Sequence, residues 1–324
     1  MSVLYLDRPG LQLESGGQCL VLRATGERPQ SVPLRSLERV IVHGAAQIDA
    51  RALAALGAAG VEVMCVSGHA RGRIGLLPAT GYRSAGRRLG QYAAQQSPEF
   101  RLAWSRQLLR AKLRCQRRWL TQLAGTRADL RRTITRATAT VDTALARLPE
   151  APSLAVLRGH EGAAAAAWFA TFAQSCAPAL GFNGRQRRPP RDPVNATLSL
   201  GYSLASGEAT FAALAAGLDP YLGLFHEPAW NHRALASDLI EPLRPRVDAL
   251  VHELFRKGEL RADQYRTEDA GLHLGPAASA VFFPAWEREL ARPARRWLRR
   301  VCVRLGQALL TLSPAFDAGE EDDL

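Results

Sequence analysis

The 324-residue sequence predicts an α+β fold, in which a small amino-terminal β-sandwich-like domain is followed by a larger all-helical domain. Up to residue 84, short apolar runs alternate with glycine, proline and polar breaks at the spacing typical of hairpins. From about Gln91 onward, leucines recur at helical spacing instead. With 47% hydrophobic and 22% charged residues the chain can bury a core, which excludes a wholly disordered protein.

Five short strands are expected in residues 1–84, the predicted β-rich domain. They cover residues 3–6, 19–22, 40–42, 61–66 and 74–77. One helix, residues 50–56, is placed among them, because its apolar positions recur at helical spacing and Gly57 supplies a stop. We expect mainly antiparallel pairing of these strands. Pro78 and Gly81 then end the strand pattern and predict a domain boundary.

The charge balance indicates an anionic partner. The chain has 42 basic and 30 acidic residues, a formal net charge of +12, and only Lys112 and Lys257 among the bases are lysines. Arginine forks match phosphate oxygens, so nucleic acid is the leading partner. A GC-rich genome would explain arginine in place of lysine, but it does not explain the sign of the net charge. The last residues, 317–324, form an acidic tail that we expect to be disordered.

The positive charge is concentrated where the predicted helical domain, residues 85–316, begins. Its first 66 residues contain 14 basic and 4 acidic side chains. The pattern predicts an amphipathic helix with leucines on one side, and a second helix at about residues 126–148. Arg110, Arg114 and Arg117 lie on the cationic side of the first helix. They are predicted to contact DNA because few acids are present to compensate them, the alternative being an ordinary solvated face.

No segment resembles a membrane span or a secretory signal. The longest apolar run, residues 162–173, is well short of the ~20 residues that a bilayer requires. The five cysteines lie far apart without a CxxC pair, so neither a disulfide framework nor a cysteine-rich zinc site is indicated. We therefore expect a soluble, cytoplasmic protein without a membrane partner.

Widely separated acidic and imidazole side chains suggest a site for a hard metal ion. Asp238 and Glu241 are three residues apart, so on a helix both carboxylates point the same way. His226 lies within loop reach of them, and Glu161 follows a helix start that Ser153 is predicted to cap. An imidazole with two or three carboxylates suits Mg²⁺ or Mn²⁺. Taken singly, each residue has a plainer interpretation: a core histidine, a capped helix start or a partner of the helix dipole.

A cationic, proline-rich loop lies between these positions. Residues 184–195 contain Arg185, Arg187, Arg188 and Arg191, and an apolar helical pattern resumes directly afterwards. A basic loop before a helix can hold a phosphate, so these four arginines are predicted to bind DNA. A disordered surface loop is the alternative interpretation.

Four motifs occur in an order that resembles one family. They are RGHEG (158–162), RRPPRDPVNATLSLGYSL (187–204), GLDPYLGLFH (217–226) and SDLIEPLRP (237–245). In this order they resemble the CRISPR-associated spacer-acquisition integrase and endonuclease, the universal adaptation nuclease of CRISPR systems. The amino-terminal β-type pattern agrees more loosely, so the resemblance covers most of the chain.

The resemblance implies a fold, an activity and a set of partners. It implies a β domain that mediates homodimerisation and a helical catalytic domain that binds Mg²⁺ or Mn²⁺. Carried over by motif, the metal ligands are Glu161, His226 and Glu241, while Asp238 lies one turn away and binds directly or through water. In the implied reaction, the 3′-hydroxyl of a short foreign DNA fragment attacks a phosphodiester at a CRISPR repeat; water in its place would cut DNA. The implied partners are that DNA and a small ferredoxin-like second core adaptation protein.

Rival interpretations stay open at this point. His232 lies between His226 and Asp238 and is the main rival ligand on spacing alone, and His160 directly precedes Glu161. A non-catalytic arginine-rich scaffold for nucleic acid would use the same cationic surface, with acids that only cap helices. An unrelated metal hydrolase of a small phosphorylated substrate is the third hypothesis, but it gives no reason for so extended a cationic surface.

Overall fold

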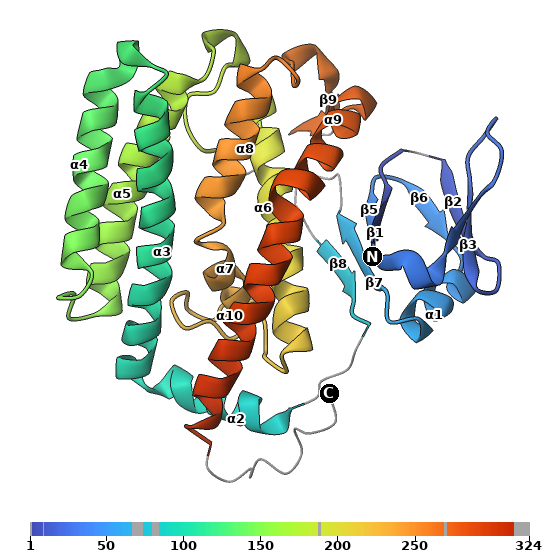
Figure 1. Cartoon of the computed structure of the whole chain (residues 1–324), viewed down its shortest axis with the longest axis horizontal. Coiled ribbons are helices and arrows are strands. Elements are labelled where there is room, and N and C mark those ends of the chain that lie inside the picture. Colours follow the sequence, from blue (N-terminus) through green and yellow to red (C-terminus); the bar gives the residue numbers. More distant parts are fainter. Residues whose placement is uncertain are drawn as a thin grey trace.

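The structure is a computed structural model, which describes residues 2–8, 10–66, 74–79, 84–186, 189–268 and 271–313. The amino-terminal strands gather at one end of the molecule, and the long helices stand side by side over the rest of it (Figure 1). The predicted fold class, a small β-rich region followed by a larger helical one, is confirmed. The predicted acidic tail, residues 317–324, lies outside the described residues.

Two four-stranded sheets form the amino-terminal part. The elements are β1 (Ser2–Leu6), β2 (Leu11–Ser15), β3 (Cys19–Arg23), β4 (Gln30–Pro33), η1 (Leu34–Ser36), β5 (Leu37–His43), β6 (Ala46–Ile48), α1 (Ala50–Ala58), β7 (Glu62–Val66) and β8 (Ile74–Leu77). The first sheet has the order β1-β5-β7-β8, and the second has the order β4-β3-β2-β6. All five predicted strands are present, and α1 begins at the predicted residue.

The expected mainly antiparallel pairing is wrong. β1 with β5, β5 with β7, and β2 with β6 are parallel pairs. The antiparallel pairs are β2 with β3, β3 with β4, and β7 with β8. Between β5 and β7 the chain crosses over through α1, and such a crossover returns the chain in the same direction. The helix predicted at residues 50–56, between the strands at 40–42 and 61–66, therefore already implied that these two strands are parallel.

The first sheet is covered on both faces. Val40 and Val42 of β5 pack into a core that also contains residues of the second sheet and of α1. Ile41, between them, packs with Met64 of β7 into the larger core of the helical part. Side chains alternate along a strand, so one strand serves two cores.

Helices make up most of the remaining chain. They are α2 (Ala85–Gln96), α3 (Pro98–Ala124), η2 (Ala128–Leu130), α4 (Arg131–Arg147), α5 (Leu154–Ser175), η3 (Pro178–Leu180), α6 (Pro193–Ala215), α7 (Ala234–Ile240), α8 (Arg244–Arg256), η4 (Ala262–Gln264), α9 (Pro276–Trp286), the π-helical η5 (Glu287–Ala291) and α10 (Arg292–Leu310). The first predicted cationic helix is α3, and the second is divided between η2 and α4. An antiparallel hairpin of β9 (Tyr265–Glu268) and β10 (Gly271–Leu274) is an addition to the expected all-helical part. Among the described helices, none is both long enough and apolar enough to cross a membrane.

A buried ion network joins the first sheet to the helices. Arg39 of β5 contacts Glu62 of β7 and Glu208 of α6. Arg295 of α10 lies 3.2 Å from Glu208 and also contacts Glu287 of η5. The Arg39 and Glu208 side chains are only 4% and 1% exposed. The position of the sheet against the helices therefore depends on buried charges, and each of them is stabilised only by its oppositely charged partners.

Candidate active site

Glu161 lies two turns into α5, on the side that faces α3. α5 begins after Ser153, whose hydroxyl accepts the N–H of Val156 at 3.3 Å, as the sequence predicts. The Glu161 carboxylate is 23% exposed and lies 2.5 Å from Nζ of Lys112, on α3. It is therefore held by a buried cation while solvent still reaches it.

Glu241 follows α7 directly and meets the same lysine. Its Oε2 lies 2.5 Å from Nζ of Lys112, and its Oε1 lies 2.7 Å from Nε of Arg244. Burial by itself would raise the pKa of Glu241, but the charges of Lys112 and Arg244 outweigh it and lower that pKa from 4.5 to about 2. Glu241 is therefore an ionised carboxylate throughout the physiological pH range.

His226 is oriented by Asp238. Nδ1 of the ring lies 2.6 Å from Oδ1 of Asp238. An ionised carboxylate can only accept, so Nδ1 donates and Nε2 is the ring nitrogen left to act as a ligand. The imidazole is 30% exposed and lies within electrostatic range of Glu241.

Asp238 is fully buried and also holds the loop that carries His226. Its Oδ2 accepts the N–H groups of Leu224 and Phe225 at 2.6 and 2.9 Å. Its Oδ1 accepts the N–H of His226 at 2.9 Å, in addition to the ring contact. With four donors around its two oxygens, Asp238 is placed to fix His226.

Lys112 and Arg244 are site residues that the sequence predictions missed. Lys112 falls beside Leu109 and Leu113 on the buried side of α3, and it is only 5% exposed. A lysine is almost never buried without an ionic partner. Its place among predicted apolar positions was thus a signal that an acidic group lies opposite. Arg244 is three residues after Glu241, a spacing at which helical side chains meet.

The donor set has the chemistry of a site for a hard cation. Two carboxylates, those of Glu161 and Glu241, share one ammonium. His226, whose Nδ1 is already bonded, lies within electrostatic range of Glu241. Carboxylate oxygens and a neutral imidazole are the ligands that Mg²⁺ and Mn²⁺ accept. Within the described ranges, no group of three or more histidine, cysteine, aspartate or glutamate side chains is already arranged to hold a metal ion. In this structure, the cation that both glutamates contact is the Lys112 ammonium.

The two rival histidines differ in their surroundings. Nε2 of His232 lies 3.0 Å from Oγ of Ser237, so that nitrogen has a hydrogen-bond partner in the chain. The His232 ring lies edge-on to His226, with 5.8 Å between the ring centroids. His160 precedes Glu161 on α5 and so points about 100° away from it around the helix.

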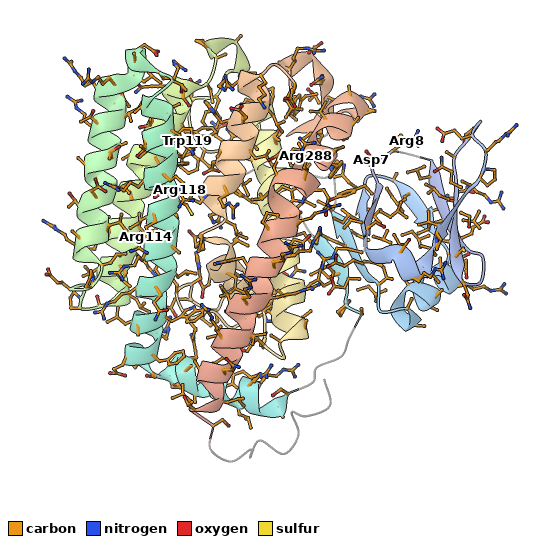
Figure 2. The ribbon with its side chains drawn as sticks, in the orientation of Figure 1. Asp7, Arg8, Arg114, Arg118, Trp119 and Arg288 are labelled. Atoms are coloured by element: carbon orange, nitrogen blue, oxygen red, sulfur yellow. The ribbon has the colours of Figure 1, made fainter. Side chains whose placement is uncertain are left out.

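The predicted DNA-contacting arginines of α3 lie at the surface. Arg110, Arg114 and Arg117 are all exposed, and Figure 2 shows Arg114 with Arg118 along this helix. Arg117 forms a 2.6 Å ion pair with Asp142 of α4. These positions agree with the cationic face that the sequence predicts.

The arginines of the proline-rich loop have different surroundings. Arg185 donates to Oδ1 of Asn195 at 2.8 Å and to Oγ of Ser199 at 2.9 Å, so it holds the loop against α6. Arg191 is exposed. Arg187 and Arg188 lie outside the described residues.

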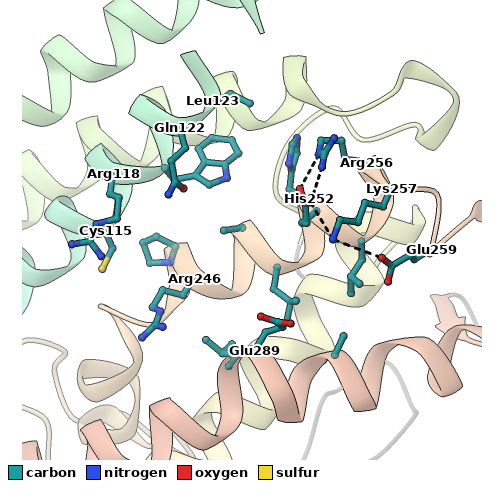
Figure 3. A pocket seen from close by; sticks show the side chains of 18 of the residues that line it. Cys115, Arg118, Gln122, Leu123, Arg246, His252, Arg256, Lys257, Glu259 and Glu289 are labelled. Atoms are coloured by element: carbon teal, nitrogen blue, oxygen red, sulfur yellow. Dashed lines mark hydrogen bonds and ion pairs between the residues drawn. The ribbon is translucent and has the colours of Figure 1, made fainter. Parts of the chain in front are cut away.

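A groove of about 680 Å³ lies elsewhere, between α3, α8 and η5 (Figure 3). Trp119 and Leu123 contribute to its apolar lining. Its basic lining residues are Arg118, Arg246, Arg256, Lys257 and Arg288. The glutamate pair around Lys112 is not part of this lining, so this groove and the candidate chemistry are separate features of the described surface.

The pKa of Glu241 gives a testable pH dependence. Because the pKa is lower in the folded state, the ionised form contributes stability above pH 4.5 that is lost as the pH falls towards 2. We expect the unfolding free energy, measured in urea with chelator present, to fall by a few kcal/mol over this window. In Glu241→Gln this part of the fall should be absent.

Glu253→Gln is the matched control for that measurement. The pKa of Glu253 is also lowered to about 2, by its hydrogen bond with Arg256, but both side chains are largely exposed. Solvent screening makes such a pair worth little. Equal effects of the two substitutions would show that the buried contact between Lys112 and Glu241 does not form in solution.

Comparison with known proteins places this chain in a family. Residues 4–288 match the family described as CRISPR associated protein Cas1. The chain is 30% identical over 300 residues to the CRISPR-associated endonuclease Cas1 1 of Thermodesulfovibrio yellowstonii. The aligned region covers 92% of this chain and 94% of the relative.

Two solved structures share the fold. One, described as a casposase bound to integration product, has a TM-score of 0.78 at 21% identity and covers 95% of this chain and 91% of the other. The second is a chain of a Cas6-RT-Cas1–Cas2 complex, with a TM-score of 0.80 at 21% identity, covering 97% of this chain and 35% of the other. The family match extends over most of the sequence, and the motif resemblance is confirmed: this protein belongs to the Cas1 family of CRISPR-associated proteins.

Proposed function

We propose that this protein is a divalent-metal-dependent DNA integrase and endonuclease that inserts short foreign DNA fragments into a CRISPR array. The observation that carries the proposal is that Glu161 and Glu241 meet at the Lys112 ammonium, while a His226 ring that Asp238 holds in place lies within electrostatic range of Glu241. A relative named as an endonuclease and a neighbour bound to an integration product support the same activity.

Glu161, Glu241 and Nε2 of His226 are the groups that would hold Mg²⁺ or Mn²⁺. When bound, the ion would lower the pKa of the attacking hydroxyl and neutralise charge that develops on the phosphate oxygens. Asp238 keeps the imidazole in the tautomer that presents Nε2. Arg244 stays beside Glu241, with its guanidinium 4.9 Å from the ring centre of Tyr202, and so keeps one fixed positive charge at the site.

The proposed reaction is a transesterification. The 3′-oxygen of the fragment forms a bond to the phosphorus of a repeat phosphodiester, and the bond from that phosphorus to the leaving 3′-oxygen breaks. With water as the nucleophile, the same step is hydrolysis of DNA. Arg110, Arg114 and Arg117 on α3, with Arg191, are proposed to contact the backbone because they are exposed cations.

We further propose how the chain is organised and with what it assembles. Residues 1–84 would form the dimerisation domain and residues 85–316 the catalytic domain. Joining both ends of a fragment requires two active sites at a fixed separation, which a symmetric dimer supplies. The structural neighbour from a complex that contains Cas2 supports a small second adaptation protein as the other partner.

A strand-joining assay tests the proposed function. The full chain is incubated with a supercoiled plasmid that carries a CRISPR repeat and with a labelled DNA fragment. We expect label in the plasmid with Mn²⁺ or Mg²⁺, none with chelator, and none when the fragment ends in a 3′-deoxynucleotide that lacks the attacking hydroxyl. DNA binding without joining or cleavage under any of these conditions would favour the non-catalytic scaffold.

Lys112→Met tests the metal site without measuring activity. The substitution replaces the ammonium with an apolar side chain of similar length, so Glu161 and Glu241 lose the cation between them. We expect Mn²⁺ to bind at least about tenfold more tightly and to raise the thermal unfolding temperature more than in the unaltered protein. Isothermal titration calorimetry and thermal unfolding with increasing Mn²⁺ measure these effects.

The chain supplies a matched control in its second lysine. Lys257 is half exposed and lies 3.4 Å from Glu253 and 3.9 Å from Glu259. Lys257→Met should leave Mn²⁺ binding unchanged. If Lys112→Met also leaves Mn²⁺ binding unchanged, the two glutamates do not hold the ion.

A further inference from the structure

Trp230 is the most exposed of the large apolar side chains at the described surface. It is 99% exposed, whereas Trp119, Trp168 and Trp286 are buried in the helical part. An indole buries roughly 150–250 Å² when it packs, so leaving one in water forgoes a large hydrophobic gain. Single exposed apolar residues are common, so exposure alone assigns no role to this side chain. Its position in the fold adds the second observation.

Trp230 lies at the tip of a turn that the backbone defines. The N–H of His232 donates to the carbonyl oxygen of Ala229 at 3.1 Å and closes the turn. Asn231, beside Trp230, has a φ of 53°, a left-handed conformation that asparagine tolerates better than most residues. The turn therefore presents the indole outward from a closed hydrogen-bonded base.

The base of this turn is in contact with the candidate metal ligand. The His232 ring lies 5.8 Å from the His226 ring, and its Nε2 lies 3.0 Å from Oγ of Ser237 on α7. Beyond the turn, Arg233 donates to the carbonyl oxygen of Ile74 at 2.9 Å. The loop is thus anchored to α7 through His232 and to β8 through Arg233, and it carries Trp230 two residues before the ring that lies against His226.

The surroundings of the loop are those of a surface that meets an anion. Glu227, next to His226, accepts from Arg101 at 2.8 Å and from Arg158 at 2.7 Å. One carboxylate therefore serves two guanidinium groups, so these three side chains together have one positive charge in excess. An exposed aromatic ring on a loop that two arginines contact through Glu227 matches a single nucleic-acid strand. Such a strand offers a π-face with every base and a phosphate with every nucleotide.

We propose that Trp230 is a stacking platform for an unpaired nucleobase of the DNA strand that enters the active site. The inference rests on the proposed function, because it needs DNA at the Glu161 and Glu241 pair. A base inside a duplex has both faces covered, so the platform acts on an unpaired end of the strand. Since every base has a π-face, the contact favours unpaired over paired ends without selecting a sequence.

The test compares DNA binding by the full chain and its Trp230 variants, with chelator present so that nothing reacts. Two labelled duplexes are used, one blunt and one with an unpaired 3′ end. Loss of a base-stacking contact typically weakens binding roughly tenfold or more. For Trp230→Ala we expect such a loss on the unpaired end and none on the blunt duplex. Trp230→Phe should retain most of the affinity, and Trp230→Leu, apolar but not aromatic, should bind like the alanine variant.

Val303→Ala controls for the removal of exposed apolar surface. Val303 lies on α10 and is 45% exposed, and its replacement should leave both affinities unchanged. In the unaltered protein, the duplex with an unpaired 3′ end should quench part of the indole fluorescence. The same duplex should quench little in Trp230→Phe, which lacks that indole.

Three results would overturn the proposal. If every Trp230 variant binds each duplex as tightly as the unaltered protein does, the indole does not stack on DNA. If strand joining persists in that case, the proposed function still stands. An equal loss on both duplexes would show a contact that does not depend on an unpaired base. A change in the mass of the assembly, with DNA affinity unchanged, would place Trp230 in a protein interface. Failure of the unaltered protein to bind or join DNA would instead count against the proposed function.

Discussion

His226→Ala is expected to lower the rate of strand joining more than about a hundredfold. Substitutions of groups that merely orient a metal ligand typically cost 10–100-fold, and His226 is proposed to be a ligand itself. Alanine removes the imidazole but leaves the main-chain N–H that Asp238 binds at 2.9 Å, so the loop keeps its anchor. The initial joining rate in Mn²⁺ and the circular dichroism of the variant are the measurements.

Asp238→Asn separates orientation from ligation. An amide can still accept from the backbone groups of Leu224 and Phe225, but it no longer presents a charged acceptor to Nδ1 of His226. We expect a loss of about 10–100-fold that excess Mn²⁺ partly restores, because the imidazole is present but loosely held. His226→Ala should not be restored by excess metal.

His160→Ala is the control for both variants. It removes an imidazole next to Glu161 whose position on α5 points elsewhere, so the joining rate should change little. If His160→Ala and His226→Ala reduce the rate equally, the proposed ligand set is wrong. An unchanged rate in His226→Ala alone would remove His226 from the site.

Glu208→Ala should be among the most destabilising single substitutions in the chain. It takes from Arg39 and Arg295 a buried carboxylate that both contact. Breaking a buried ion pair by removing one partner costs about 3–5 kcal/mol, because it leaves a charge in a low-dielectric interior. Each arginine keeps one other partner, Glu62 or Glu287, which holds the expected loss within this range. Urea unfolding followed by circular dichroism measures it.

Glu253→Ala provides the comparison for that loss. Glu253 pairs with Arg256 at 2.6 Å, but the two side chains are 40% and 56% exposed. Exposed pairs of this kind contribute at most about 1 kcal/mol. If Glu208→Ala costs no more than Glu253→Ala, the network between the first sheet and the helices is not a determinant of stability.

Much of the fold could be predicted because its elements have simple periods. The leucines of α3 recur at helical spacing, and β1, β3, β5, β7 and β8 are short apolar runs between breaks. β2 escaped prediction although Leu11 and Leu13 are buried on one side of it, a period-two signal over only five residues. β4 and β6 are short and contain few apolar residues, so hydrophobic pattern does not reveal them. The direction in which two strands pair depends on the connection between them. The apolar pattern within each strand carries no information about that connection.

The site was predicted in part, for a different reason. The family motifs point to Glu161, His226, Asp238 and Glu241. In the structure Glu161 and Glu241 meet at Lys112, and His226 pairs with Asp238. That these four residues form one metal site stays a prediction. Neither Lys112 nor the role of Asp238 as the anchor of the His226 loop could be derived from spacing. Lys112 reaches both glutamates only because α3 packs against α5 and α8.

The chemistry of the residues and the local spacing of apolar positions are properties of the sequence alone. They determined the fold class, the cationic surface of α3 and the residue types of the site. The tertiary structure decided which charges are partners: Lys112 between two glutamates, Asp238 beneath His226, and Glu208 between two arginines. The physical reason is that Coulomb and hydrogen-bond energies depend on distance and burial in space, and both are set by how distant segments pack.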